Sequence, residues 1–333
     1  MGDRLQYSTS GSPRKLAFGS NKRSSVGPLC GPQPLRFPCF EAAADDLQTR
    51  CDASDYGCMA ELKMTWKVRH MNKIHLYTVT MATKREILAL ANRLDELTDS
   101  QLDWVRAFID QFHLTHEFTR YPQSDIVTEG VLQGLGDLLR IHHAMSRQAL
   151  SKAPFEYAFE KALNRAGHKA VLNTNPTNPG HDITINGVAV SLKTEAATGI
   201  KKNFIRISKW MEMGRGDWDP PTIQLPRFRQ HLRGYSRIFT LRCLVKTGTQ
   251  YWYELVEIPA SLLEEATEKA MRPASRTKQQ TTPYYCEVFD ESGHKKFALY
   301  FDAGTERKLQ IKDLRKNLCR VHATWKFEST PLQ

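Results

Sequence analysis

Three charged side chains, Asp182, Lys193 and Glu195, have types and a spacing suited to attack on a phosphate. Two carboxylates beside an ammonium can hold a hard cation on oxygen ligands, orient a water molecule and offset the charge that builds on the phosphate. Lys193 lies in an otherwise apolar run, where an unpaired charge would be costly. These features favour a catalytic cluster over the competing interpretation, a surface hairpin with solvated charges.

A tight hairpin is the element that must position these groups. Two short β-branched runs, 183–185 and 188–194, flank Asn186-Gly187, the dipeptide best suited to the positive φ angles of a type I′ turn. Side chains alternate faces along a strand, so Lys193 and Glu195 share one face of the second arm. Folding the hairpin brings Asp182, at the start of the first arm, near that face.

The order Asp182, short hairpin, x-x-Lys193 resembles the PD-(D/E)XK nuclease motif, with Pro179 three residues before the aspartate instead of one. Longer strings between residues 81 and 327 resemble the SmaI-type type II restriction endonucleases more specifically. These strings are Asn-Pro-Gly-His-Asp-Ile-Thr-Ile (178–185), Leu-Lys-Thr-Glu-Ala (192–196), Ser-Lys-Trp-Met-Glu (208–212), Arg-Ile-Phe-Thr-Leu-Arg (237–242), Leu-Val-Glu-Ile-Pro (255–259) and Glu-Arg-Lys-Leu-Gln-Ile-Lys (306–312).

The resemblance implies an α/β (α+β) fold: a PD-(D/E)XK restriction-endonuclease-like core with a mixed central sheet flanked by helices, preceded by a helical segment. It implies a type II restriction endonuclease that hydrolyses double-stranded DNA with Mg²⁺ at the palindrome CCCGGG, after the first cytosine or, alternatively, with blunt ends. A palindromic site implies a homodimer, each subunit cutting one strand. A cognate DNA methyltransferase is expected in the same system, without direct contact.

The second metal ligand is the open point of the predicted site. Asp182 is the first ligand candidate, and Lys193 is expected to contact the scissile phosphate or the attacking water. The family motif has an acid two residues before the lysine, where this chain has Ser191. Glu195 ranks slightly ahead as the substitute, because the strand alternation places it on the correct face, with its carboxylate about 6 to 7 Å further along the strand. Glu156, on a helix expected to begin at about residue 154, is the other; Glu160, one turn later, ranks below it.

Arginine and lysine side chains beyond the hairpin are candidates for contacts with DNA, because an arginine fork suits guanine O6 and N7 in the major groove. Most surface arginines contact phosphate or nothing, so base readers cannot be separated from the others by sequence. The candidates are Arg206, Lys209, Arg215, Arg237, Arg242, Arg307 and Lys308.

Chain-wide properties agree with a nucleic-acid partner. The 333 residues carry a net charge of +11 with a pI near 9.3, which favours polyanions. No apolar run of about 18 residues occurs, so we expect a soluble protein of the bacterial cytoplasm. Residues 1–80 are predicted to be a disordered, dispensable basic extension, 81–152 a helical subdomain and 153–330 the nuclease core.

The helical subdomain should begin with two amphipathic packing elements. Apolar residues between 84 and 97 fit one helix, and Thr98-Asp-Ser-Gln101 offers a capping box for a second. The residues of the second helix expected to face inward are Leu102, Val105, Phe108, Ile109 and Phe112.

Two other functions stay open at this point. One is a repair or recombination nuclease, since a fold does not fix its target; the other is a non-catalytic DNA-binding protein, which Ser191 makes conceivable.

Overall fold

A computed structural model describes residues 63–70, 73–80, 82–174, 180–214, 216–275 and 280–330, with side chains from residue 82 onward. Residues 1–62 of the predicted basic extension, Pro179 and Arg215 lie outside the described residues. Within the predicted extension, β1 (Lys63–His70) and β2 (Lys73–Thr80) form a two-stranded sheet. In the described part of the chain, no helix has the length and apolar character needed to cross a membrane.

Two capped helices follow, α1 (Lys84–Leu94) and α2 (Asp99–His113). The predicted capping box is confirmed: the Thr98 amide donates to Gln101 Oε1 at 2.9 Å, and the Gln101 amide donates to Thr98 Oγ1 at 3.4 Å. The prediction of an inward face is wrong for α1, because none of its described residues is buried. For α2 it is confirmed in part: Leu102, Val105 and Phe108 are half-buried, whereas Ile109 and Phe112 are 49% and 41% exposed.

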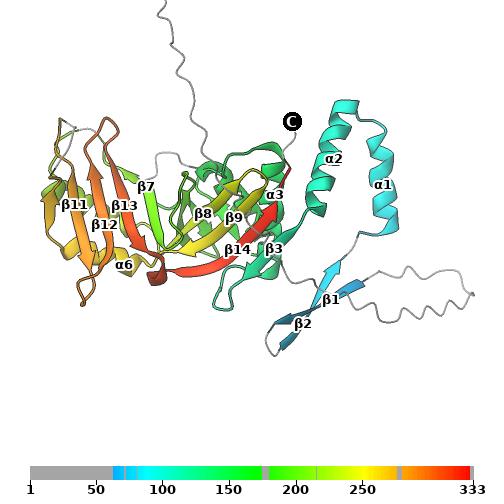
Figure 1. The fold of residues 1–333 in the computed structure, drawn as a ribbon, viewed down its shortest axis with the longest axis horizontal. Coiled ribbons are helices and arrows are strands. Elements are labelled where there is room, and N and C mark those ends of the chain that lie inside the picture. The colour runs from blue at the N-terminus through cyan, green and yellow to red at the C-terminus, as the bar shows by residue number, and fades with distance from the viewer. Residues whose placement is uncertain are drawn as a thin grey trace, which may run out of the picture. The chain divides into compact units, whose positions relative to one another are not determined.

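The larger sheet, called the central sheet here, has seven strands in the order β3-β14-β9-β8-β6-β5-β4. Figure 1 shows β3, β14, β9 and β8 of this sheet. All neighbouring strands are antiparallel except β6 and β8, so the sheet is mixed, as predicted. Its strands are β3 (His116–Arg120), β4 (Ala170–Leu172), β5 (Ile183–Ile185), β6 (Val188–Glu195), β8 (Arg237–Thr247), β9 (Gln250–Glu257) and β14 (Arg320–Glu328).

One face of this sheet packs against α3 (Glu129–Met145) and α4 (Lys152–Arg165). Apolar residues of both helices, including Leu135 and Phe159, join alternate residues of the strands, such as Leu192 and Leu241, in one hydrophobic core. Burial of this face stabilises the hairpin, since each fully buried large apolar side chain contributes about 1.5–3 kcal/mol. The anchored hairpin can therefore hold charged groups at its ends in fixed positions.

A second, five-stranded sheet has the order β10-β11-β12-β13-β7 and is antiparallel throughout. Its strands are β7 (Phe204–Glu212), β10 (Met271–Pro273), β11 (Tyr284–Phe289), β12 (Lys295–Asp302) and β13 (Lys308–Arg315). A second core joins this sheet to the short helices α5 (Leu225–Leu232) and α6 (Ala260–Glu264) and to Ile238 and Val256 of the central sheet. The described residues thus form a mixed α/β protein with six α-helices.

Candidate active site

The predicted hairpin is confirmed as β5 and β6, joined by Asn186 and Gly187 with φ angles of 50° and 85°. Asp182 immediately precedes β5, and its amide donates to the carbonyl of Val190 at 2.9 Å. The approach to Asp182 is tightly packed: a Cβ at Gly234 would lie 3.3 Å from Cα of Gly180. The backbone is therefore fixed on both sides of the aspartate.

The two carboxylate oxygens of Asp182 have different partners. Oδ2 accepts hydrogen bonds from the Leu192 amide at 2.6 Å and from Ser191 Oγ at 3.0 Å, whereas Oδ1 accepts from Lys152 Nζ at 2.7 Å. Burial alone would raise the pKa of Asp182, but the charges of Lys193 and Lys152 hold it below its ordinary value. Ser191, at the position where the motif has an acid, therefore orients the aspartate instead.

Lys152 connects Asp182 to the helix glutamate. Its ammonium lies 3.1 Å from Glu156 Oε1 and 2.7 Å from Asp182 Oδ1, so the two carboxylates converge on one cation. Lys152 and Glu156 are one turn apart at the start of α4, which places their side chains on the same face. The side chain of Lys152 is 45% exposed, whereas those of Glu156 and Asp182 are 20% and 17% exposed. This lysine is thus a partly solvated cation at a negatively charged position.

Lys193 completes the cluster from the neighbouring strand. Its Nζ lies 3.9 Å from Asp182 Oδ2 and 5.3 Å from the centre of the Trp210 ring, and its side chain is 8% exposed. Burial lowers the pKa of Lys193 to about 8, against the opposing effect of the Asp182 charge. Tyr235 packs edge-on against Trp210, and burial followed by the charge of Asp182 raises the pKa of its hydroxyl. Apolar and aromatic groups thus enclose the Lys193 side of the site.

Glu195 has other partners. Its Oε2 pairs with the guanidinium of Arg242, and its Oε1 accepts the Arg206 amide at 3.1 Å. Burial raises the pKa of Glu195 although Arg242 opposes this effect. The structure therefore joins Asp182, Lys193 and Glu156 in one cluster through Lys152, but holds Glu195 in a buried ion pair. Glu160 accepts the Leu172 amide at 2.9 Å and so supports β4.

The predicted DNA-contact residues differ in how free they are. Arg242 is fully buried and bonded to Glu195, Glu254 and the carbonyls of Lys201 and Phe204, so no donor remains for a base edge. Arg242 therefore stabilises the fold and does not make the predicted DNA contact. These bonds satisfy the guanidinium, which would be costly to leave unpaired in the core.

The other candidates lie at the surface or half-buried. Arg206 and Lys209 on β7 are exposed, and Lys209 pairs with Glu212. Arg307 stacks over Trp218 with 5.2 Å between the guanidinium carbon and the ring centre, and Lys308 lies 3.9 Å from Glu306.

A second charged cluster surrounds Arg237. Its guanidinium donates to both oxygens of Asp125 at 2.8 and 2.9 Å and to both oxygens of Glu257 at 2.6 and 2.9 Å. Asp125, Glu257 and His322 offer ligand-type atoms within 4.8 Å of one another, a grouping able to hold a divalent metal. Because Arg237 already neutralises both carboxylates, and His322 Nε2 lies 3.0 Å from Glu257 Oε2, we interpret this cluster as structural.

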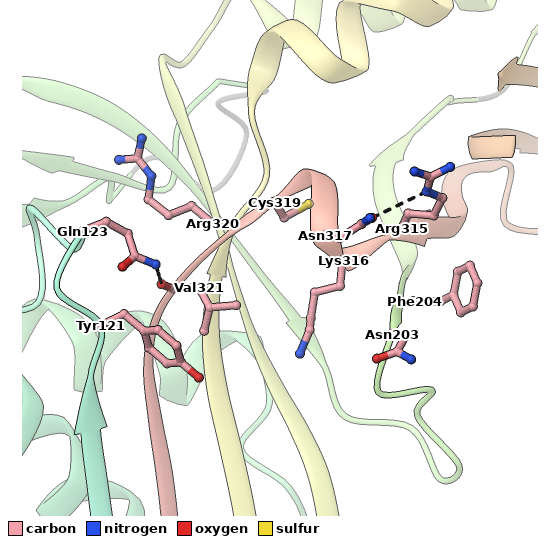
Figure 2. Close-up of a pocket in the computed structure, with 10 residues that line it drawn as sticks. All are labelled: Tyr121, Gln123, Asn203, Phe204, Arg315, Lys316, Asn317, Cys319, Arg320 and Val321. Atoms are coloured by element: carbon pink, nitrogen blue, oxygen red, sulfur yellow. Dashed lines mark hydrogen bonds between the residues drawn. The ribbon is translucent and has the colours of Figure 1, made fainter. Parts of the chain in front are cut away.

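A hollow of about 750 Å³ has three basic residues in its rim, Arg315, Lys316 and Arg320, which extend from the end of β13 to the start of β14 (Figure 2). In Figure 2, Arg320 lies on the same side as Tyr121, and Arg315 lies on the other side near Phe204. The charge of the rim is partly compensated, since Lys316 donates to Glu254 at 2.9 Å and Arg315 to Asp290 at 2.7 Å. Its lining includes neither Asp182 nor Lys193, so this hollow is not part of the catalytic cluster.

Sequence reasoning missed Lys152, Trp210 and Tyr235. The spacing of Lys152 and Glu156 was an available signal, because charges four residues apart on a helix pair. Trp210 and Tyr235 gave no comparable signal. They reach the site from β7 and from the turn after α5, and no local pattern predicts that approach.

Comparisons with known proteins agree with the chemistry of the site, which is suited to phosphodiester hydrolysis. Residues 90–327 match the SmaI family of type II site-specific deoxyribonucleases. The type II restriction enzyme SmaI of Serratia marcescens is 44% identical over 252 residues, which cover 75% of this chain and all of that relative. The chain therefore belongs to the SmaI family and is a type II site-specific deoxyribonuclease, which acts on DNA.

Proposed function

We propose that this deoxyribonuclease cuts double-stranded DNA at CCCGGG, after the first cytosine, with a PD-(D/E)XK core that uses Mg²⁺. The observation that carries the catalytic part is the convergence of Asp182 Oδ1 and Glu156 Oε1 on one cation, with Lys193 3.9 Å from the other Asp182 oxygen. The choice of CCCGGG and of the cut position comes from the family resemblance. Mixed sheet order, with β6 and β8 parallel beside antiparallel neighbours, supports the core assignment.

The donor set fits a hard divalent ion. Asp182 and Glu156 present carboxylate oxygens to the same point, and oxygen is the ligand type that Mg²⁺ prefers. The fit requires the Lys152 ammonium to turn toward solvent, which its partial exposure allows. Bound there, Mg²⁺ would lower the pKa of a water molecule and stabilise the charged phosphate. Glu156 thus becomes the acid that replaces the one missing at Ser191, in preference to Glu195.

The chain's own groups have separate tasks around that point. The Leu192 amide and Ser191 hydroxyl hold Asp182 Oδ2, which fixes the direction of Oδ1. Lys193 can donate to a phosphate oxygen or to the attacking water. In its buried position its charge is little screened, so its interaction with a phosphate is stronger than in water. The apolar side chains near Lys193 keep this position shielded from bulk solvent.

Recognition of guanine needs arginine forks that are free to move. Arg206 on β7 meets this condition best among the described candidates, because it is exposed and its amide is anchored on Glu195. Arg307, Lys209, Lys308 and Arg237 are candidates for phosphate contacts, with Arg237 the least available of them. We propose further that the enzyme is a homodimer on its palindrome, in the bacterial cytoplasm, with a methyltransferase that protects the same site.

The predicted boundary at residue 152 needs a correction. The segment 81–152 is not a separate helical subdomain, because β3 pairs with β14 in the seven-stranded sheet, α3 packs in the core of that sheet, and Lys152 reaches Asp182. The proposed nuclease core therefore extends from β3 to residue 330, and residues 1–80 are proposed to be an extension that cleavage does not require. The family match, which starts at residue 90, supports the last point.

Plasmid digestion tests the function in one experiment. The full-length protein with Mg²⁺ should convert a plasmid carrying CCCGGG into discrete fragments, and sequencing of their ends should show a cut after the first cytosine. Blunt ends would overturn the proposed stagger alone. A smear or cutting of branched DNA would indicate a repair nuclease, and a mobility shift without scission would indicate a binding protein; either result would contradict the proposal. A plasmid without CCCGGG is the control.

A further inference from the structure

Helices α1 and α2 expose an unusual amount of apolar surface. In α1, Ile87, Leu88 and Leu90 are 56%, 54% and 58% exposed; in α2, Trp104 is 43% exposed, together with Ile109 and Phe112. On α1, Ile87, Leu90, Ala91 and Leu94 follow the spacing of one helical face. A helix of this length without buried residues is marginal in water, because isolated helices shorter than about 12–15 residues rarely persist. Something must therefore cover this face.

We propose that the covering partner is a second copy of this chain, and that α1 and α2 of two protomers pack about a twofold axis. Two helical hairpins related in this way form a four-helix arrangement, in which each apolar face covers the same face of the other copy. The inference assigns a surface to the proposed homodimer and rests on that part of the proposed function. A dimer also supplies one catalytic cluster for each strand of the duplex, because the described residues of one chain contain one Asp182–Lys193 cluster.

The available area agrees with such an interface. A stable interface buries about 800 Å² on each partner. Aromatic side chains carry roughly 150–250 Å² each, so Trp104 and Phe112, which are 43% and 41% exposed, can bury roughly 60–110 Å² each. The four aliphatic side chains, with exposed fractions of 49–58%, add comparable areas, so the six side chains together supply a large share of the interface. Patches of this kind on a monomer are rare and mark interaction sites.

The alternative cover, the first eighty residues of this chain, is disfavoured by the comparison with the shorter relative. The alignment with SmaI takes in all of that protein but only 252 of the 333 residues here. The family match includes all of α2 and begins within α1. A segment of about eighty residues that the relative lacks is therefore the less favoured cover, whereas a second copy is available to both proteins.

Light scattering with the full-length protein, without DNA or metal, provides the test. The wild type should have twice the mass of 38.1 kDa. Leu90→Lys should raise the dimer dissociation constant at least ~100-fold, because a twofold interface would bury two unpaired charges. Met145→Lys is the matched control: Met145 is also 58% exposed, lies at the end of α3, and should leave the mass unchanged. Trp104→Lys repeats the test on α2.

Photo-crosslinking identifies the partner. A benzoylphenylalanine at position 87, in a mixture of ¹⁴N- and ¹⁵N-labelled protein, should give mixed-isotope crosslinks to α1 or α2. A monomeric wild type, an unchanged Leu90→Lys dimer, or crosslinks within one chain to residues 1–81 would each overturn the proposal. Because no cleavage is measured, a dimer that fails to cut plasmid would contradict the proposed function but leave the interface standing.

Discussion

Replacing Lys152 should make the enzyme bind divalent metal more tightly. The Lys152 ammonium lies 2.7 Å from Asp182 Oδ1 and 3.1 Å from Glu156 Oε1, the two oxygens proposed to bind the metal. Ion and lysine cannot occupy this point together. In Lys152→Met the competitor is absent, while the aliphatic stem is kept. The two carboxylates then face each other without a counter-charge, which favours an added cation.

The size of the effect follows from the exposure of the pair. Partly exposed ion pairs contribute about 0.2–1 kcal/mol each, so release from two contacts is worth roughly 0.4–2 kcal/mol. Since about 1.4 kcal/mol is a factor of ten, the metal affinity should rise about 2- to 30-fold. The low exposure of Asp182 and Glu156, 17% and 20%, places the expectation toward the upper end.

Isothermal titration calorimetry with Ca²⁺ or Mn²⁺, on the protein without DNA, measures this affinity without any cleavage. Lys161→Met is the matched control, because Lys161 is an exposed lysine on the same helix and its removal changes the net charge equally. Lys152→Arg, which keeps the charge, should bind metal as weakly as the wild type. An affinity that is unchanged or lower in Lys152→Met would refute the shared position of lysine and metal.

Two further predictions concern the acids and the pH dependence of stability. Glu156→Gln should weaken Ca²⁺ binding at least about tenfold with little change in stability. Glu195→Gln should lower the free energy of unfolding by about 3 kcal/mol and leave the metal affinity unchanged, because Glu195 pairs with the buried Arg242. Calorimetry measures the metal affinity and urea unfolding the stability, and the reverse pattern would restore Glu195 as the ligand. Burial lowers the pKa of His143 from 6.5 to about 3, so the folded protein holds this imidazole in its neutral form. The unfolded chain takes up the proton below pH 6.5, so the free energy of unfolding is unaffected above pH 6.5 and declines as the pH falls toward 3. At pH 5 this loss amounts to about 2 kcal/mol, and urea unfolding should show a flatter pH dependence for His143→Phe; equal slopes in the two proteins would contradict it.

Local patterns predicted the hairpin and its turn because those depend on neighbouring residues. Asn186-Gly187 sets the turn, and the alternation of β6 sets which side chains share a face. The same alternation ranked Glu195 above Glu156, whereas we propose Glu156 as the ligand because the structure pairs Glu195 with Arg242. A strand pattern places Glu195 on the correct face but says nothing of Arg242, which lies on β8, more than forty residues further along the chain. Long-range pairing thus decides which cation each acid contacts.

The exposed faces of α1 and α2 show a related limit. Their apolar spacing predicts a buried face, but within one chain the structure leaves Ile87, Leu90 and Ile109 exposed. A helix that packs on its own core and one that packs on a second copy have the same sequence pattern. Lys152 was within reach of local reasoning, since it pairs with Glu156 one turn away, but its link to Asp182 depends on how α4 meets the hairpin.

The central claim is that Asp182 and Lys193 act together on a DNA phosphate. The most direct measurement follows binding and cleavage of a duplex containing CCCGGG by Asp182→Ala and Lys193→Ala, with mobility shift in Ca²⁺ and cleavage in Mg²⁺. We predict that both variants bind the duplex within about tenfold of the wild type but lose at least ~10³-fold in cleavage rate, as expected for loss of a group that stabilises developing charge. Cleavage by either variant at a rate near that of the wild type would contradict the account.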